Sequence, residues 1–240
     1  KTDFNFISSI DEALKLDISA AIIATPTSKH TSDLLKLVKS KIPVLVEVPL
    51  SNSLRDLNKI NSISKKLKVP ILIGHNLKFH PSLIKINQIV KNNKYGKSYF
   101  SRSQFGEYLP ECHPWEDYKK RYEAKKSLGG GPILTSIHEI DHAVWLFGRV
   151  KSVTCVAKTL KLPIDVEDTA MIILEHQNKI ISEVQLDFIQ RPYTRNIQIV
   201  SDKGSIEWGL IDNNLLAYSD KTKKWKKINK IKKFDINQTY

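Results

Sequence analysis

Glycine is scarce in this chain, and the shortage limits the ligands that the chain can hold. Only nine glycines occur among 240 residues, and none stands in the first 73. No Gly-x-Gly-x-x-Gly turn is present to cradle a phosphate. The Gly-x-Ser-x-Gly elbow of many serine hydrolases is missing too. These absences argue against a phosphate-cradling loop in this chain and against that type of nucleophile.

Cysteines and long apolar runs are also few. Cys112 and Cys155 cannot build a disulfide framework and lack a Cys-x-x-Cys context, so we expect inert thiols in a reducing compartment. No apolar run approaches the roughly 20 residues of a membrane helix. Residues 1–5 show neither an initiator Met nor a signal-peptide core. We therefore expect a cytoplasmic protein without a membrane partner.

Positive charge is in excess, with 38 Lys and Arg against 25 Asp and Glu, a net charge of +13. Such a charge suits nucleic acid, anionic lipid or an acidic substrate. Much of it is scattered lysine on expected helix surfaces. The densest run, KTKKWKKINKIKK at 221–233, favours an edge strand with lysines facing water. We expect no nucleic-acid partner, although binding through this run stays an alternative.

The first third of the chain alternates apolar strands with amphipathic helices. Strands are expected at residues 18–25, 43–47 and 69–75, with helices within residues 27–39 and at 54–68. This order implies parallel strands joined by right-handed crossovers. We predict that residues 1–76 form an open parallel α/β sheet in which only the later strand–helix units are present.

The pattern changes after residue 76. We expect helices at residues 81–93 and 134–147, a long strand at 98–109 and a polar segment at 111–128. Later strands follow one another at 152–160, 169–176, 180–189, 195–201 and 205–209. Turn residues at 177–178 and 202–204 join neighbouring strands as hairpins. The fold class is therefore α/β: a parallel sheet over residues 1–76, then an α+β domain over 77–240 with a mostly antiparallel sheet.

Polar residues follow the ends of the three parallel strands. Thr25, Glu47 and Asn76 stand at these ends, where open α/β sheets bind ligands. Lys78 lies just before the next helix start, and a basic group beside a helix N-terminus suits an anionic or hydroxyl-rich ligand. His30, near the start of the first helix, faces either a ligand or only solvent. A capped loop without a ligand is the alternative interpretation of this rim.

Two later segments carry side chains suited to chemistry. Residues 106–122 gather aromatic and polar groups, which form either a sugar-binding wall or ordinary surface packing. The triple glycine at 129–131 lets the backbone approach something closely. His138, Asp141 and His142 follow on one helix face. His138 is a candidate general acid or base, because a histidine pKa lies near neutrality; we expect no metal, although these three residues leave that alternative open.

Five motifs in this order resemble the Gfo/Idh/MocA family of NAD(P)-dependent sugar oxidoreductases. The motifs are ATPTSKH (24–30), EVPLS (47–51), GHNLKFHP (74–81), GEYLPECHPWEDY (106–118) and GGGPILTSIHEIDHAVWLFG (129–148). The resemblance implies that residues 1–76 are the C-terminal part of a Rossmann nucleotide-binding domain, a partial Rossmann sheet. It implies that residues 77–240 are an α+β substrate-binding domain, with NAD or NADP as cofactor. It also implies hydride transfer at a hydroxyl-bearing carbon of a sugar, sugar nucleotide or cyclitol. A homo-oligomer formed through the C-terminal sheet belongs to the same expectation.

The resemblance also assigns residues to roles. It implies that His138 is the catalytic histidine. Cofactor-lining positions would be Ala24, Thr25, Pro26, His30, Glu47, Pro49 and Asn76. Substrate-bordering positions would be Lys78, His80, Trp115, Tyr118 and Thr135.

Three departures from the family pattern stand out. Val48 replaces the lysine of the family's Glu-Lys-Pro motif, and Thr135 replaces an acidic residue before the histidine. The glycine-rich first unit and the closing C-terminal segment are missing, so the chain resembles an internal piece of a longer protein. Residues that choose between NAD and NADP would lie upstream. A non-catalytic sugar- or nucleotide-binding relative is therefore the alternative to an oxidoreductase.

Overall fold

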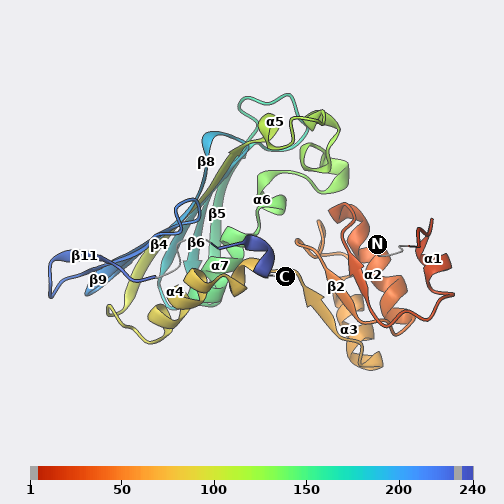
Figure 1. Cartoon of the computed structure of the whole chain (residues 1–240), viewed down its shortest axis with the longest axis horizontal. Coiled ribbons are helices and arrows are strands. Elements are labelled where there is room, and N and C mark those ends of the chain that lie inside the picture. Colours follow the sequence, from red (N-terminus) through yellow and green to blue (C-terminus); the bar gives the residue numbers. More distant parts are fainter. Residues whose placement is uncertain (1–4, 230–233, 240) are drawn as a thin grey trace. The chain divides into compact units, whose positions relative to one another are not determined.

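The computed structural model describes residues 5–229 and 234–239 of the chain (Figure 1). The chain divides into two units. The first contains residues 1–74 and 127–129, and the second contains residues 75–126 and 130–240. No helix of the described residues combines the length and apolarity needed to cross a bilayer.

The first unit is built around a parallel sheet with the order β1-β2-β3. Its elements are α1 (Ile10–Ala13), β1 (Ala21–Ile23), α2 (Thr27–Lys39), β2 (Val44–Val46), α3 (Leu57–Leu67) and β3 (Ile71–Ile73). Helices α2 and α3 bury apolar side chains such as Leu34, Val38 and Ile60 against Val44 and Val46 of the central strand. The predicted strand and helix order is therefore confirmed.

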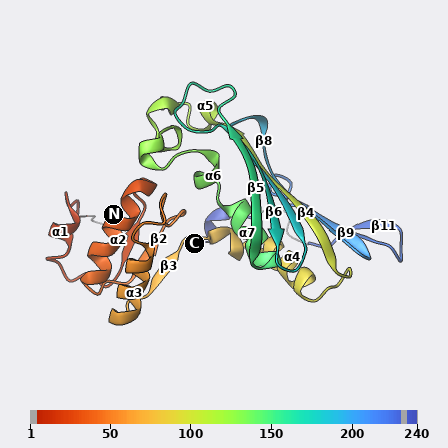
Figure 2. The same cartoon turned by 180° about the vertical axis from the view of Figure 1, so that it is seen from behind.

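The strand predicted at residues 18–25 is shorter than expected and is not buried on both faces. Its regular part is β1, and Ile22 on that strand is 71% exposed. Leu72, which lies on the same face through the strand register, is 62% exposed. An unbroken apolar run predicts burial on both faces, whereas α2 and α3 cover only the opposite face of this sheet (Figures 1 and 2).

The second unit is dominated by a long twisted sheet. Its described strands are β4 (Ser98–Tyr108), β5 (Val150–Lys158), β6 (Thr169–His176), β7 (Ile181–Asp187), β8 (Ile189–Ser201), β9 (Gly204–Gly209), β10 (Leu215–Ser219) and β11 (Lys224–Lys227). They lie in the order β11-β10-β9-β8-β4-β7-β6-β5. Only the β4–β7 pair among them is parallel. The predicted class, a partial Rossmann sheet followed by a mostly antiparallel sheet, is confirmed.

Two strands at the end of this sheet bear on the sequence predictions. β10 was not predicted, although Asp212, Asn213 and Asn214 just before it are typical turn residues. β11 is the edge strand expected within the basic run, and all four of its residues are exposed. The remainder of that run, residues 230–233, lies outside the described residues.

Helices cover one face of the large sheet. The second unit also contains η1 (Asn76–Phe79), α4 (Pro81–Lys91), α5 (Leu109–Cys112), η2 (Tyr118–Lys120), η3 (Tyr122–Ala124), α6 (Pro132–Thr135), α7 (His138–Phe147) and η5 (Ile236–Thr239); η4 (Lys126–Leu128) lies at the junction. Ile86 of α4 and Leu146 of α7 share one apolar cluster with Ile199 and Trp208 of the sheet. Figures 1 and 2 both show η5 beside α4 and α7.

The single helix predicted at residues 134–147 is wrong, because the chain breaks it into α6 and α7. Ser136, at the break, has φ −112° and ψ 38°, outside the helical region. Just before the break, the Thr135 hydroxyl donates to the carbonyl of Gly131 at 2.9 Å, a local bond that competes with helix continuation. The break makes His138 the first residue of α7 rather than an internal one.

Candidate active site

The triple glycine positions the start of α7. A Cβ at Gly130 would lie 2.4 Å from the carbonyl oxygen of Glu123, and one at Gly131 would lie 2.3 Å from a carboxylate oxygen of Glu167. Gly131 also has φ +93°, which glycine adopts readily. The predicted close backbone approach is therefore confirmed, although the neighbours are other parts of the chain. Pro132 then begins α6 with its fixed φ.

His138 lies within a cluster of titratable groups from η1 and α7. Lys78 donates to Asp141 Oδ1 at 2.8 Å, and His75 Nδ1 lies 3.4 Å from Asp141 Oδ2. The His75 ring meets the His138 ring edge to face, with centroids 6.2 Å apart. The spacing of three residues between His138 and Asp141 thus brings an ion pair to one side of the imidazole.

Burial controls the protonation of His138. It lowers the pKa of His138 to about 3, and the positive charges of Arg195, His75 and Lys78 add to this shift. The near-neutral pKa expected from the sequence is therefore wrong, because removing an imidazolium from water costs free energy. His138 Nδ1 is buried without a hydrogen-bond partner among the described residues. At neutral pH the ring is an uncharged proton acceptor.

A second layer of buried charge lies behind the histidine. Arg195 Nε on β8 lies 2.8 Å from Oε1 of Glu139, whose side chain is 1% exposed. Burial raises the pKa of Glu139, while Arg195 opposes the shift. The Arg195 guanidinium also lies over the Phe105 ring, 4.5 Å from its centroid. Two independent contacts therefore hold this guanidinium in place.

His142 belongs to this buried layer. It is 1% exposed, and neither ring nitrogen has a hydrogen-bond partner among the described residues. Burial, followed by the charges of His138 and Arg195, lowers the pKa of His142 well below its ordinary value. The described residues contain no group of three or more His, Cys, Asp or Glu that could share a metal ion. Asp141 instead pairs with Lys78.

His30 holds two loops at the carboxyl ends of strands in the first unit. Its ring nitrogens lie 2.7 Å from the carbonyl oxygen of Thr25 and 2.8 Å from that of Pro49. The side chain is 1% exposed. From the sequence, His30 was expected to face either a ligand or solvent. Instead, both ring nitrogens lie against backbone carbonyls. His30 shapes this rim from within.

The other predicted cofactor positions of the first unit differ in exposure. Ala24 and Thr25 are exposed, and the Thr25 hydroxyl donates to Asp33 at 3.1 Å. Pro26 and Glu47 are half-buried, and Pro49 is buried after a cis peptide bond. Exposed backbone and a carboxylate thus stand at the ends of β1 and β2.

Asn76 and His80 lie inside the second unit. Asn76 donates to the Thr239 hydroxyl at 3.0 Å, so η1 is tied to η5. His80 Nδ1 accepts from the backbone N–H of Ser82 at 3.2 Å and thereby caps α4. Burial lowers the pKa of His80 to about 4. Both side chains therefore stabilise the fold of the second unit independently of any ligand.

The remaining predicted substrate positions differ in exposure. Trp115 is 74% exposed, and its ring meets that of His113 at 5.1 Å between centroids. Tyr118 packs against the apolar cluster that contains Leu109 and Phe188. Thr135 is half-buried, with its hydroxyl committed to Gly131. Of these three residues, Trp115 is the most exposed.

Sequence reasoning missed Arg195 and Glu139. It also missed Tyr193, whose ring meets that of Phe105 edge to face with centroids 5.8 Å apart. A signal for Arg195 was available, because it shares strand parity with the buried Ile197 and Ile199 of the predicted strand at 195–201. An arginine at an inward position is a buried charge in need of a partner. No such signal was available for Glu139, because the residues three and four positions away on the same helix contain no lysine or arginine to pair with it.

Comparisons with known proteins agree with this architecture. Residues 1–75 match the model of the oxidoreductase family with an NAD-binding Rossmann fold, and residues 83–207 match the GFO/IDH/MocA C-terminal domain. Myo-inositol 2-dehydrogenase from Thermotoga maritima is 26% identical over 202 residues, which are 79% of this chain and 56% of that protein. Rhizopine catabolism protein MocA from Rhizobium meliloti is 23% identical over 133 residues, 55% of this chain and 39% of that protein. The chain thus spans about half the length of the curated relatives it matches.

Solved structures show the same fold. A levoglucosan dehydrogenase in complex with NADH and L-sorbose has a TM-score of 0.82 at 17% identity, covering 92% of this chain and 63% of that one. An oxidoreductase structure from Thermotoga maritima has a TM-score of 0.80 at 21% identity, covering 92% and 68%. The C-terminal family model alone spans more than half of the sequence, and the Rossmann model spans the part before it. This chain therefore belongs to the Gfo/Idh/MocA family.

Proposed function

We propose that the protein is an oxidoreductase that transfers a hydride between NAD or NADP and a hydroxyl-bearing carbon of a sugar, sugar nucleotide or cyclitol. The observation that carries the proposal is His138, a neutral imidazole at the start of α7 beside the Lys78–Asp141 pair. Relatives named for this chemistry include D-apiose dehydrogenase from Rhizobium rhizogenes, 23% identical over 168 residues. One structural neighbour was crystallised with NADH and UDP-GlcNAcA.

The rim of the first unit fits part of a dinucleotide. Exposed Ala24 and Thr25, with Pro26, Glu47 and Pro49, would hold it at the strand ends, and His30 would keep their loops in place. Asn76 is the further candidate from η1. The nicotinamide ring supplies the hydride acceptor or donor when it is bound.

His138 would exchange the proton of the reacting hydroxyl. A neutral imidazole accepts that proton in the oxidation direction and returns it in the reduction direction. Lys78 would place positive charge near the developing alkoxide, since its amine already lies in this cluster. His80, Trp115, Tyr118 and Thr135 remain predicted substrate neighbours.

The experiment is turnover of the full-length protein with a panel of sugars and cyclitols and either nicotinamide, followed by the absorbance of the reduced cofactor. We expect His138→Gln to lower kcat by about 10²–10⁴-fold while substrate binding by calorimetry is retained. His176→Gln is the matched control, because that imidazole is also buried but lies within hydrogen-bond distance of Gly148 and Ser182, outside the His138 cluster. Equal kcat in wild type and His138→Gln would contradict the proposal.

The alternative, a sugar- or nucleotide-binding relative without turnover, rests on Val48. An isopropyl group can neither donate nor accept a proton where the family pattern has lysine. Val48→Lys separates the two functions. A large gain in turnover would indicate an enzyme weakened by the substitution, whereas ligand binding without turnover in both forms would favour the binding relative.

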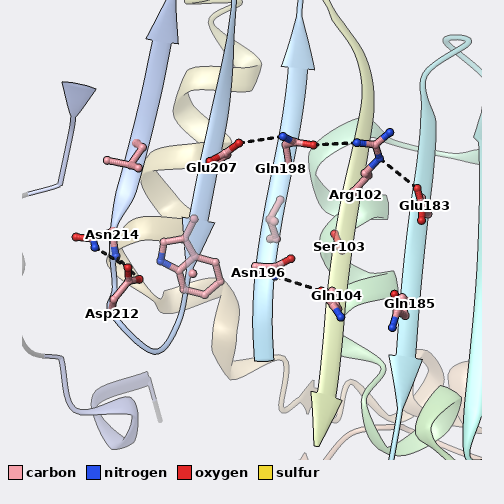
Figure 3. Close-up of a pocket in the computed structure, with 14 residues that line it drawn as sticks. Arg102, Ser103, Gln104, Glu183, Gln185, Asn196, Gln198, Glu207, Asp212 and Asn214 are labelled. Carbon is pink, nitrogen blue, oxygen red and sulfur yellow. Dashed lines mark hydrogen bonds and ion pairs between the residues drawn. The ribbon is translucent and has the colours of Figure 1, made fainter. Parts of the chain in front are cut away.

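We also propose that the protein self-associates through the uncovered face of the large sheet. Strand register places Val156, Met171, Ile173 and Ile181 together on this face, each 40–59% exposed. Beside them, Figure 3 shows a polar row in which Glu207, Gln198, Arg102 and Glu183 are linked across four strands. A contiguous apolar patch with a polar margin suits a protein interface.

Two free cysteines are consistent with a reducing cytoplasm as the setting.

A further inference from the structure

The second unit contains a cavity of about 620 Å³ whose polar lining differs from that of the His138 cluster. Its walls include Arg195 and Tyr193 from β8, His80, and the segment that carries Phe234 and Asp235. Arg195 is the only permanent cation among the described lining residues, and Asp235 is the only carboxylate. The cavity therefore presents one fixed positive group.

Arg195 is oriented before any ligand arrives. Its Nε edge faces Glu139 Oε1 at 2.8 Å, and its plane lies over Phe105. No described group accepts a hydrogen bond from its two Nη atoms. A guanidinium held at one edge and open at the other is a preformed fork for a planar oxyanion, with little rotamer entropy left to lose.

Neighbouring donors complete the lining. The Tyr193 hydroxyl has no hydrogen-bond partner among the described residues, and the side chain is 36% exposed. His80 accepts at Nδ1 from Ser82, so the proton of the neutral ring is on Nε2. Three residues that carry hydrogen-bond donors of different geometry thus line one cavity.

The charge balance selects the kind of anion. Glu139 already pairs with the positive charge of Arg195, and the exposed Asp235 adds a negative charge at the cavity wall. A doubly charged phosphate would therefore be opposed more strongly than a single carboxylate. We propose that Arg195 and Tyr193 form a carboxylate subsite, so that the substrates of this protein are sugar acids. This inference extends the proposed function and depends on it, because only that function makes the bound acid a substrate.

The experiment compares sugars that differ only at one carbon. Glucuronate is paired with glucose, and galacturonate with galactose, in calorimetric binding to the full chain and in turnover assays with NAD and NADP. We expect each acid to bind at least tenfold more tightly than its neutral partner, because hydrogen bonds to a charged carboxylate are stronger than those to a neutral hydroxyl. Equal binding of acid and neutral sugar by the wild type would overturn the inference.

Variants test the residues. Arg195→Lys keeps the charge beside Glu139 and removes the fork, and the double variant Arg195→Gln/Glu139→Gln removes both charges without leaving either one buried alone. Both should abolish the preference for the acid, whereas Arg149→Gln, at an exposed arginine of the same unit, should keep it. Tyr193→Phe should reduce it several-fold. A preference that survives both Arg195 changes would also overturn the inference.

The two proposals fail separately. If an acid binds through Arg195 but no sugar is oxidised or reduced, the carboxylate subsite stands and the oxidoreductase proposal fails. If neutral sugars are turned over as efficiently as acids, the oxidoreductase proposal stands and the subsite fails.

Discussion

Four histidines of the second unit share one electrostatic property: burial favours their neutral form. Burial lowers the pKa of His80 to about 4 and that of His138 to about 3, and it lowers the pKa values of His75 and His142 as well. Each of these rings is part of a hydrogen bond, a ring contact or an ion pair within the unit. The same residues that serve the candidate site therefore penalise the folded state in acid.

This property predicts the pH dependence of stability. Between pH 6.5 and about 4 the unfolded chain binds a proton at residue 80 that the folded chain does not, so the free energy of unfolding falls as pH falls. The loss for this residue amounts to roughly 3 kcal/mol, at about 1.4 kcal/mol per pKa unit. Urea unfolding of wild type and His80→Asn at pH 7 and pH 4 measures it.

Asparagine is the suitable replacement, because it also caps a helix N-terminus but does not titrate. We expect the variant to lose less stability than the wild type between the two pH values, whatever its stability at pH 7. Identical losses in both proteins would show that His80 is not the group responsible.

At the scale of elements, the turn before α6 and α7 depends on tight backbone contacts. Gly130 lies against the carbonyl oxygens of Glu123 and Tyr122, where a Cβ would be 2.4 and 2.5 Å away. These are backbone atoms that cannot rotate aside. The position of His138 at the start of α7 therefore depends on Gly130, a glycine eight residues earlier, in the turn that precedes α6.

Gly130→Ala should destabilise the protein at or above the upper end of the ~1–3 kcal/mol that overpacking costs. Gly209→Ala is the control, since its Cβ would meet only the Asp212 carboxylate at 3.3 Å. Chemical denaturation of both variants gives the comparison. A Gly130→Ala protein as stable as Gly209→Ala would mean that the turn can relax without cost.

At the scale of the whole molecule, the large sheet is covered by helices on one face and uncovered on the other. β5 is an edge strand in which all residues after Val150 are exposed. Its neighbours β6 and β7 carry the apolar patch on the uncovered face. A long exposed edge beside an apolar face invites pairing with another chain.

The double variant Val156→Lys/Ile173→Lys should therefore shift the protein toward monomer in analytical ultracentrifugation. Two lysines in each copy would bring like charges together across such an interface. Leu160→Lys is the control, because Leu160 is 62% exposed but lies after β5, outside the sheet. A wild type that is monomeric at all concentrations would remove the proposal.

The order of strands and helices, the change from parallel to antiparallel pairing and the motif around His138 could all be predicted from the sequence. They depend on local periodicity, turn residues and a short pattern, which are properties of neighbours along the chain. The split of residues 134–147 into two helices, the pKa of His138 and the Arg195–Glu139 pair depended on tertiary structure. They arise from burial and from contacts between residues far apart in sequence, such as 139 and 195, whose distance in space only the packed sheet and helices determine.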